Sequence, residues 1–373
     1  MQKISLVDKN NFHQVSWPTT YWGEKVSRFF QPLMEEGVEK FVQNVQTTLQ
    51  LIQLEDLILP IAVNQKEYNN SYVVSNYYGT YLLKEKLAKE KPRLLPLVSP
   101  FLLPLKGILK LLKINKAVYL NTWFFSASLP PHITPSQMIE VRRFLTEVYP
   151  DHLLMFRSIT KCFNSSLYEA LEQAGFMLVP SREIYFYNPH EKENFSKRVH
   201  YHRRRDIRLL EQSGYEVIGN RDFSTEDIKR CKELYKRVYI DKYTPYSPDF
   251  SEAFISHLMK HDLLNFLALK KEGRIDAVVA YQCDHQMMQV PFIGYDTELP
   301  AEIGLYRMIC LLPCLEADKQ GLFFHDGHGA DTFKTHRGLK KATEYTAIYS
   351  AHFRGLRRLP WKMGERMVDL MLE

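Results

Sequence analysis

An alternation of strand, helix and strand between residues 152 and 189 constrains the fold of this chain more than any other feature of its sequence. Residues 152–159 (HLLMFRSI) and residues 182–189 (REIYFYNP) are short runs of apolar and aromatic side chains, which is typical of buried strands. Between them, apolar side chains recur at helical spacing over residues 164–175, and the predicted helix ends at Gly175. This order of elements predicts an α/β domain.

The same alternation of strands and helices is predicted in the second half of the chain. A helix is predicted from Ser224 and Asp227, which have the spacing of a helix-capping box, and residues 264–296 contain three predicted strands. A chain of 373 residues is too long for one ordinary hydrophobic core. We therefore predict two domains, residues 1–194 and residues 195–373, which meet in the polar stretch NPHEKENFSK.

Composition and charge exclude several classes of protein. Hydrophobic residues make up 45% of the chain and charged residues 25%, which are ordinary globular values that leave no room for extensive disorder. The net charge of +6 favours anionic ligands, such as a nucleotide cofactor or an RNA end. It is too small to be a strong indication of a nucleic-acid-binding protein. The five cysteines contain no CxxC pair, which argues against a disulfide framework or a zinc ribbon. The N-terminal residues show no signal peptide, so a cytoplasmic protein is expected.

The most apolar stretch of the chain is LLPLVSPFLLPLKGILKLLK, from Leu94 to Lys113, and three prolines interrupt it. Its second half places leucine and isoleucine between lysines at helical spacing, a pattern that also suits a helix lying on a membrane surface. We favour the other interpretation, in which the stretch packs on the protein or closes over the ligand. The prolines are expected to prevent one long uniform helix.

The run HDGHGADTFKTHRGL, residues 325–339, brings three histidines, three glycines and two aspartates together. For a metal site, His325, His328 and His336 would have to converge. Neither an HExxH pattern nor a Cys/His pair accompanies them. We therefore expect no metal at this run.

The same run has the composition of an anion-binding loop at the end of a strand. Gly327 and Gly329 give the backbone freedom to expose its N–H groups, and Lys334 and Arg337 provide cations. Asp326 is placed to orient an attacking amine or to accept its proton. The alternative is an Asp-Gly turn with a solvated, charged face.

Several segments of the second half follow one another in an order that resembles a known family. They are RRRDIRLLEQSGYEV, a strand that ends in FIGYD, the helix LPAEIGLYRMI, and GLFFHDGHGADTFKTHRGL. This order resembles the GNAT-fold acyltransferases of the FemAB-like branch, where a late strand runs into a D-G-x-G-x-x-x-x-K loop. That loop here supplies Asp326, Gly327, Gly329 and Lys334. The first half, with LYEALEQAGFMLVPSREIYFYNP, resembles the degenerate first unit of the same tandem architecture.

The resemblance implies an α/β (α+β) fold of two tandem GNAT-like units, each a mixed β-sheet flanked by helices, with a ligand cleft between or within them. It implies an acyltransferase or aminoacyltransferase that moves an acyl group to the amine or hydroxyl of a small-molecule or peptide-like acceptor. The donor in such proteins is acyl-CoA, an acyl carrier protein or an aminoacyl-tRNA, which acts as a cosubstrate. No tightly bound cofactor is expected.

One departure from the family pattern concerns the donor. Ordinary GNAT enzymes hold the CoA pyrophosphate with an Arg/Gln-x-x-Gly-x-Gly/Ala loop, whereas this chain has ELPAEIGLYRM there, with only Gly304 in place. A helix N-terminus still offers free N–H groups and a positive dipole end, so an anion is expected near Ile303, Gly304 and Leu305, with Arg307 nearby. The missing glycines favour tRNA or carrier-bound donors over acetyl-CoA.

Other candidate residues come from single positions. Tyr295 ends a predicted strand and is a candidate proton donor to the leaving group, although a buried core tyrosine would look the same. The basic run His200–Arg208 is expected to be a solvated helix face. The candidate catalytic residues are Asp326, Lys334 and Tyr295; the candidate donor-binding residues are Ile303, Gly304, Leu305, Arg307, Gly327, Gly329 and Arg337; and the candidate acceptor-binding residues, in a pocket between the halves, are Tyr72, Asn76 and Tyr77.

Two other functions remain compatible with the sequence. A non-catalytic binding or scaffold protein on a GNAT-like fold would account for the eroded cofactor loop. A transferase at a membrane surface, acting on a lipid-linked acceptor, would use residues 94–113. The sequence does not indicate an oligomeric state.

Overall fold

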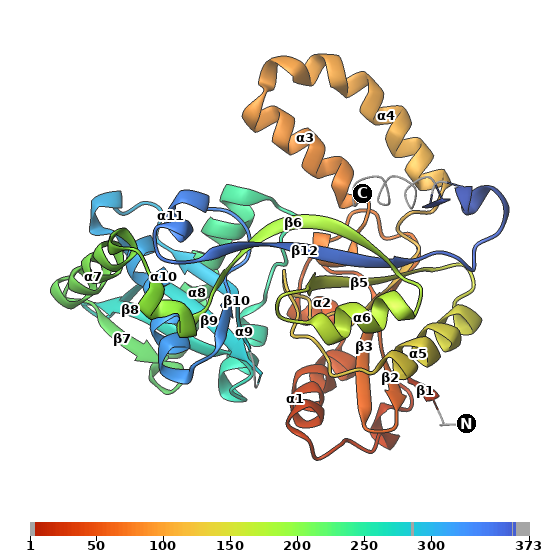
Figure 1. Ribbon diagram of the computed structural model, residues 1–373, viewed down its shortest axis with the longest axis horizontal. Coiled ribbons are helices and arrows are strands. Elements are labelled where there is room, and N and C mark those ends of the chain that lie inside the picture. The colour runs from red at the N-terminus through yellow and green to blue at the C-terminus, as the bar shows by residue number, and fades with distance from the viewer. Residues whose placement is uncertain (1–3, 285–286, 360, 363–373) are drawn as a thin grey trace.

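The computed structural model describes residues 4–284, 287–359, 361 and 362. The outer ends of the two predicted domains, residues 1–3 and 363–373, lie outside the described residues. Within the described part, strands and helices alternate along the chain (Figure 1). The strands, in their order across the sheet, are β1 (Ile4–Val7), β2 (Thr48–Leu54), β3 (Leu57–Asn64), β4 (Ala117–Leu120), β5 (Leu153–Thr160), β12 (Lys340–Tyr349), β6 (Met177–Tyr187), β11 (Phe323–His325), β10 (Met287–Tyr295), β9 (Arg274–Cys283), β8 (Asn265–Lys271) and β7 (Glu216–Gly219).

The α/β class is confirmed, but the strands form one mixed sheet of twelve among the described residues, not one sheet in each unit. The join is made by two long strands, β6 and β12, which run across the middle of Figure 1. Strand β12 lies between β5 and β6 and is antiparallel to both, with Ala347 opposite Phe156 and Ala342 opposite Ile184. Strand β6 then pairs with β11 of the second half. The ladder is therefore continuous, because a strand from each half crosses to the other.

The helices begin and end at recognisable sequence signals. Helix α5 starts with a capping box in which Thr134 and Gln137 exchange hydrogen bonds, and the predicted helix after β5 forms as α6. Helices α8 and α9 pack on one face of the second-half strands, and α7 and α10 on the other. The helices are α1 (Tyr21–Glu36), α2 (Val38–Phe41), α3 (Tyr78–Glu90), α4 (Leu95–Leu111), α5 (Pro135–Val148), α6 (Ser165–Gln173), α7 (Lys197–Gln212), α8 (Thr225–Lys236), α9 (Glu252–Lys260), α10 (Leu305–Gln320) and α11 (Asp331–Thr335).

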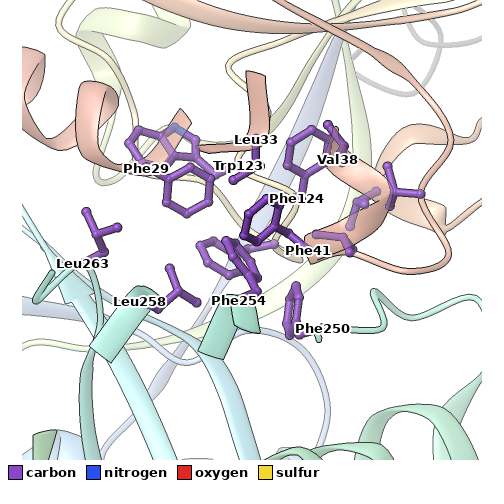
Figure 2. Close-up of a cluster of buried hydrophobic side chains, with 14 of the residues drawn as sticks. Phe29, Leu33, Val38, Phe41, Trp123, Phe124, Phe250, Phe254, Leu258 and Leu263 are labelled. Atoms are coloured by element: carbon purple, nitrogen blue, oxygen red, sulfur yellow. The ribbon is translucent and has the colours of Figure 1, made fainter. Parts of the chain in front are cut away.

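The largest hydrophobic core joins the two halves of the chain. Figure 2 shows Phe29 of α1 and Trp123 of the first half facing Phe254 of α9 in the second. The ring of Phe29 lies 4.8 Å from that of Trp123 and 5.5 Å from that of Phe254, both edge to face. Since all three side chains are buried, the halves exclude water from one shared interior. The domain boundary at residues 194 and 195 stays a prediction.

The expectation that the prolines prevent one long uniform helix between Leu94 and Lys113 is wrong, whereas closure of this stretch over the ligand stays a prediction. Helix α4 runs without a break through Pro100 and Pro104, and with α3 it forms a hairpin that projects from the body of the protein (Figure 1). Each proline removes one N–H donor, and the partner carbonyl is four residues earlier. Both prolines are exposed, so water can hydrate the freed carbonyl groups. No described helix has the length and hydropathy needed to cross a bilayer.

We predict that Phe254→Ala lowers the free energy of unfolding by about 3–5 kcal/mol, because it leaves a cavity between α1 and α9. Val217→Ala, at a residue that is 42% exposed, is the matched control and should change it by less than about 0.5 kcal/mol. Urea unfolding followed by tryptophan fluorescence and circular dichroism checks both values. A shared core would be contradicted by two separate unfolding transitions, if Phe254→Ala shifted only the transition of the part of the protein that does not contain Trp123.

Candidate functional site

The candidate site lies where two parallel strands of the sheet part. Strand β10 pairs with β11 over only three residues, from Met287 to Gln289. It continues beside β9 on its other side as far as Tyr295, which lies opposite Ala277. Beyond Gln289 the backbones of β10 and β11 are no longer hydrogen-bonded to each other. In open α/β sheets, ligands commonly bind beyond the carboxyl ends of the strands.

The loop after β11 is held in place by a buried lysine. The Lys334 ammonium, on a side chain that is 5% exposed, donates to the backbone carbonyls of Asp326 at 2.7 Å and Gly327 at 3.2 Å. A third, longer bond reaches the carbonyl of His328 at 3.4 Å. Lys334 therefore turns toward its own loop, in a geometry that suits holding the loop. Its predicted contact with a ligand stays a prediction.

Asp326 is the carboxyl group at the centre of this region. Burial raises its pKa above the usual range, and the Lys334 ammonium, 3.4 Å from Oδ2, acts in the opposite direction. The predicted proximity of Asp326 and Lys334 is present in the structure. A carboxylate with a raised pKa is a better proton acceptor than an exposed aspartate, so Asp326 is suited to the base role.

Two tyrosines and a cysteine surround Asp326. Burial raises the pKa values of Tyr239, Tyr306 and the Cys310 thiol, and the nearby charge of Asp326 raises all three further. These groups are consequently neutral at physiological pH. Tyr239 also lies close enough to Tyr72 of the first half for that group to raise its pKa. The Asp326 region thus reaches the first half through Tyr239.

The structure brings together two arginines that the sequence analysis assigned to donor binding. Asp206 of α7, which is 1% exposed, accepts from Arg307 Nε at 2.8 Å and from Arg337 Nε at 2.6 Å. One carboxylate between two guanidinium groups leaves a net positive charge beside the N-terminus of α10. The expectation that residues 200–208 form a solvated face is wrong for Asp206 and for Arg203, which are buried against α10 because each finds an ion-pair partner there.

The glycines assigned to donor binding differ in their surroundings. Gly304 has a φ of +77°, which side chains rarely adopt, so the backbone at the start of α10 already favours glycine; a Cβ atom there would also lie 2.7 Å from Cδ2 of Leu209, which would have to shift. Gly327 and Gly329 also have positive φ values, but a Cβ atom at either would meet open space. Ile303 and Leu305 flank Gly304 at the start of α10, as expected from the sequence.

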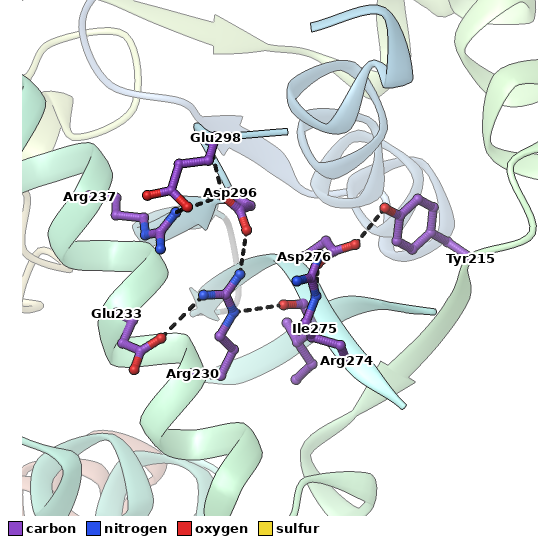
Figure 3. A network of polar contacts seen from close by, with 9 residues as sticks. All are labelled: Tyr215, Arg230, Glu233, Arg237, Arg274, Ile275, Asp276, Asp296 and Glu298. Carbon is purple, nitrogen blue, oxygen red and sulfur yellow. Dashed lines mark hydrogen bonds and ion pairs between the residues drawn. The ribbon is translucent and has the colours of Figure 1, made fainter. Parts of the chain in front are cut away.

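Tyr295 ends β10 and is fixed by its neighbours. Its hydroxyl accepts a hydrogen bond from the Lys242 ammonium at 3.0 Å, and its ring lies 5.6 Å from that of Tyr306. The next residue, Asp296, accepts from Arg230 at 2.5 Å and from Arg237 at 2.7 Å (Figure 3). These ion pairs anchor the end of β10 and so set where Tyr295 lies.

A second polar cluster, which sequence reasoning missed, lies on β5, β6, β11 and β12. Arg182 binds Glu344 through Nε at 2.7 Å and Nη2 at 3.2 Å, and His325 Nε2 lies 3.5 Å from the same carboxylate. Although burial alone would raise the pKa of Glu344, Arg182 and His325 lower it to about 2. Three cation-forming groups are therefore gathered around one carboxylate, once Arg157 is included.

Among the described residues, Arg157 is the member of this cluster that has no ion pair with a carboxylate. Its guanidinium donates through Nη1 to the carbonyls of Tyr72 at 3.2 Å and Val73 at 2.8 Å. Burial lowers its pKa, and the charge of Arg182 lowers it further. The sequence signal was an arginine in the otherwise apolar strand HLLMFRSI. A half-buried guanidinium beside a second one favours an anionic ligand.

The three predicted acceptor-binding residues do not converge. Tyr72 belongs to the Arg157 cluster, because its backbone binds Arg157 and its pKa responds to Arg182 and Glu344. Asn76 instead donates to the carbonyl of Ile114, and the backbone N–H of Tyr77 donates to Asn115. These two residues hold the chain that enters β4. Their predicted role with an acceptor stays a prediction.

The three histidines of the loop run point in different directions. His325 faces Glu344, whereas the His328 ring lies 2.8 Å from the carbonyl of Glu183. The His336 ring stacks on His202 of α7, with 5.0 Å between centroids. In the described part of the chain, no three histidine, cysteine or acidic side chains are grouped as metal ligands would be.

No protein-family model matches the chain, and no curated protein matches it. Among solved structures, L-PGS from Bacillus licheniformis is 18% identical, covering 62% of this chain and 78% of its own, with a TM-score of 0.45. FemX is 10% identical, with 62% and 79% covered and a TM-score of 0.43. A tandem GNAT protein from the clavulanic acid biosynthesis pathway is 8% identical, with 95% and 100% covered and a TM-score of 0.39. FemX and the tandem GNAT protein are of the kinds that the sequence resemblance named.

We predict that Lys334→Met lowers the free energy of unfolding by about 3–5 kcal/mol, because Asp326 would lose its buried counter-ion. Lys341→Met, at a side chain that is 49% exposed, is the control and should have little effect. Urea titration at neutral pH measures both. An unchanged stability, together with weaker ligand binding, would instead assign Lys334 to a ligand.

Proposed function

We propose that this protein is an acyltransferase or aminoacyltransferase in which Asp326 removes the proton from an attacking amine or hydroxyl. The observation that carries the proposal is a half-buried carboxyl group, 17% exposed and of raised pKa, at the point where β10 and β11 part. The resemblance of the loop around it to the FemAB-like branch supports the same reaction. The cation-forming neighbours of Asp326 are Lys334 and His325, and Tyr239 and Tyr306 are neutral ones, so Asp326 can exchange a proton.

The reaction forms one bond to the acyl carbon and breaks another. The acceptor nitrogen or oxygen attacks the donor carbonyl, and Asp326 takes the proton that the acceptor loses. The carbon–sulfur bond of a thioester, or the carbon–oxygen bond of an aminoacyl ester, then breaks. Tyr295 is the proposed proton donor to that leaving group, since Lys242 donates to its hydroxyl and would stabilise the resulting phenolate. Solvent restores both groups to their starting protonation states.

The donor is proposed to bind along the start of α10. The N–H groups of Ile303 and Gly304 donate to the carbonyls of Pro300 and Ala301, so the first turn of α10, from Leu305, would supply the N–H groups for the donor. The pair Arg307 and Arg337 carries one charge more than Asp206 neutralises. Gly327 and Gly329 leave open space on the adjoining loop. A carrier-bound acyl group or an aminoacyl-tRNA is favoured over acetyl-CoA, because the positive φ of Gly304 accounts for that glycine and the other loop glycines are missing.

Arg157 is proposed to bind an anionic group of a substrate. A guanidinium inside the protein is most stable with a carboxylate or phosphate partner, and the Glu344 carboxylate is already bound by Arg182. Tyr72, beside Arg157, is placed to contact the same group. The acceptor is thus expected to be a small or peptide-like molecule with a carboxylate or phosphate in addition to its nucleophile.

We expect Asp326→Asn to lower kcat by about 100-fold or more with little change in KM, because general base catalysis contributes on that order. The pH profile is the sharper readout. The base must be deprotonated, so the rate of the wild type should fall as pH drops through the raised pKa of Asp326, above the range of an exposed aspartate. Asp331→Asn, in the same loop but exposed, is the matched control.

The assay combines a panel of acyl-CoAs and charged tRNAs with amine acceptors and follows release of thiol or tRNA. Asp331→Asn should retain the wild-type profile. An Asp326→Asn variant with the same profile would remove Asp326 from the reaction. Failure of every donor to shift the melting temperature or to react would favour the non-catalytic binding function.

We expect Arg157→Met to raise the KM or Kd of an anionic substrate by about 10- to 100-fold, as loss of a hydrogen-bonded charge pair does. Its cost in stability should be the smaller of the two, because it removes hydrogen bonds to two carbonyls only, whereas Arg182→Met would leave Glu344 with His325 alone and should cost about 3–5 kcal/mol. Thermal shift with anionic ligands, and unfolding without them, separates the two variants. Equal destabilisation by both would make Arg157 a structural residue.

A further inference from the structure

The hairpin of α3 and α4 is the part of the fold that the proposed reaction does not use. It joins β3 to β4, with the short helical turn Pro92–Leu94 between its helices, and it stands away from the sheet in Figure 1. The site residues on β10, β11 and the following loop come from the opposite half of the sequence. The hairpin therefore needs an explanation of its own.

The inward-facing surface of α4 is partly polar. Lys106 Nζ lies 4.6 Å from the ring centroid of Tyr81, and Lys110 Nζ lies 5.3 Å from that of Tyr68. An amphipathic helix of a globular protein normally turns its apolar stripe inward. Cation–π contacts with tyrosines thus form part of the packing of α4, beside the half-buried Leu109.

Three apolar side chains in the second half of α4 are exposed. Leu105 is 39% exposed, Ile108 53% and Leu111 82%. Residues spaced by three lie about 60° apart around an α-helix, so these side chains share one face spanning about 120°. Pro104 is exposed beside them. Leu105, Ile108 and Leu111 therefore form an exposed apolar stripe on α4.

The hairpin also carries the basic charge of the protein. Residues 78–113 contain eight lysine or arginine residues and two glutamates, a net charge of +6, which equals the net charge of the whole chain. The rest of the protein is electrically neutral on this count. Lys84, Lys91 and Arg93 are among the exposed charges. An apolar stripe and a concentrated positive charge thus occur on one projecting element.

We propose that the α3–α4 hairpin docks on the surface of an anionic lipid bilayer. The stripe of Leu105, Ile108 and Leu111 would enter the boundary between headgroups and acyl chains, while the basic residues contact anionic headgroups. The described helices are too short to cross the bilayer, so the contact is interfacial. A second copy of the chain fits less well, because two hairpins of +6 charge would repel one another.

Co-sedimentation of the full chain with vesicles tests this proposal. Vesicles of phosphatidylglycerol and phosphatidylcholine should bind the protein at least 10-fold more tightly than vesicles of phosphatidylcholine alone, and added salt should weaken the binding. The pair Ile108→Glu and Leu111→Glu should reduce it by at least 10-fold. The matched control, Val148→Glu with Val217→Glu, changes two residues that are 40% and 42% exposed elsewhere and should bind as the wild type does.

A charge-reversal pair separates the electrostatic part of the contact. Lys91→Glu with Arg93→Glu should weaken binding to anionic vesicles, whereas Lys229→Glu with Lys260→Glu, also exposed, should not. All variants should keep the wild-type circular dichroism spectrum. Equal binding to neutral vesicles, no effect of the hairpin variants, or self-association in sedimentation with no vesicle binding would each overturn the proposal. The outcome does not depend on whether the protein is a transferase, since the assay contains no substrate.

Discussion

The pairing of β6 with β12 is the contact on which the rest of the architecture depends. These strands run side by side from Met177 opposite Ile348 to Phe186 opposite Lys340, and they place Arg182 directly opposite Glu344. Strand β5 is held on one side of the pair and β11 on the other. Because β11 is fixed there, the loop with Asp326 begins at a defined position beside Tyr185, with which it exchanges two backbone hydrogen bonds. The site is thus positioned by strands from both halves of the chain.

Much of this fold follows from local sequence signals, and the exceptions have physical causes. The alternation around Gly175 and the capping boxes of α5 and α8 specify their elements, because each signal acts within a few residues. The continuous sheet could not be predicted, since residues 340–349 carry no signal for inserting between β5 and β6. Asp326 and Lys334 were predicted together because they are eight residues apart in one loop. Arg157, Arg182 and Glu344 were not, because each stands alone in a separate strand.

One electrostatic arrangement recurs across the second half of the protein. A buried aspartate lies between two arginines at Asp206 and again at Asp296 (Figure 3). At Asp206 the two guanidinium groups retain one excess positive charge, whereas at Asp296 the same arginines also pair with Glu233 and Glu298. Such triads help to fix α7 against α10, and β10 against α8, in addition to apolar packing. Asp326 differs from both, since it has one ammonium neighbour and a raised pKa.

The position of β12 has a consequence for synthesis of the chain. Strands β5 and β6 are translated in the first half, yet neither can complete its hydrogen bonds until residues 340–349 have left the ribosome. For the intervening stretch of synthesis, both strands present open backbone edges, which are the surfaces on which unfinished chains associate. A ribosome that stops before residue 340 would release a product with those edges exposed. The sheet becomes continuous only once residues 340–349 have been synthesised, and not when the first half of the chain is complete.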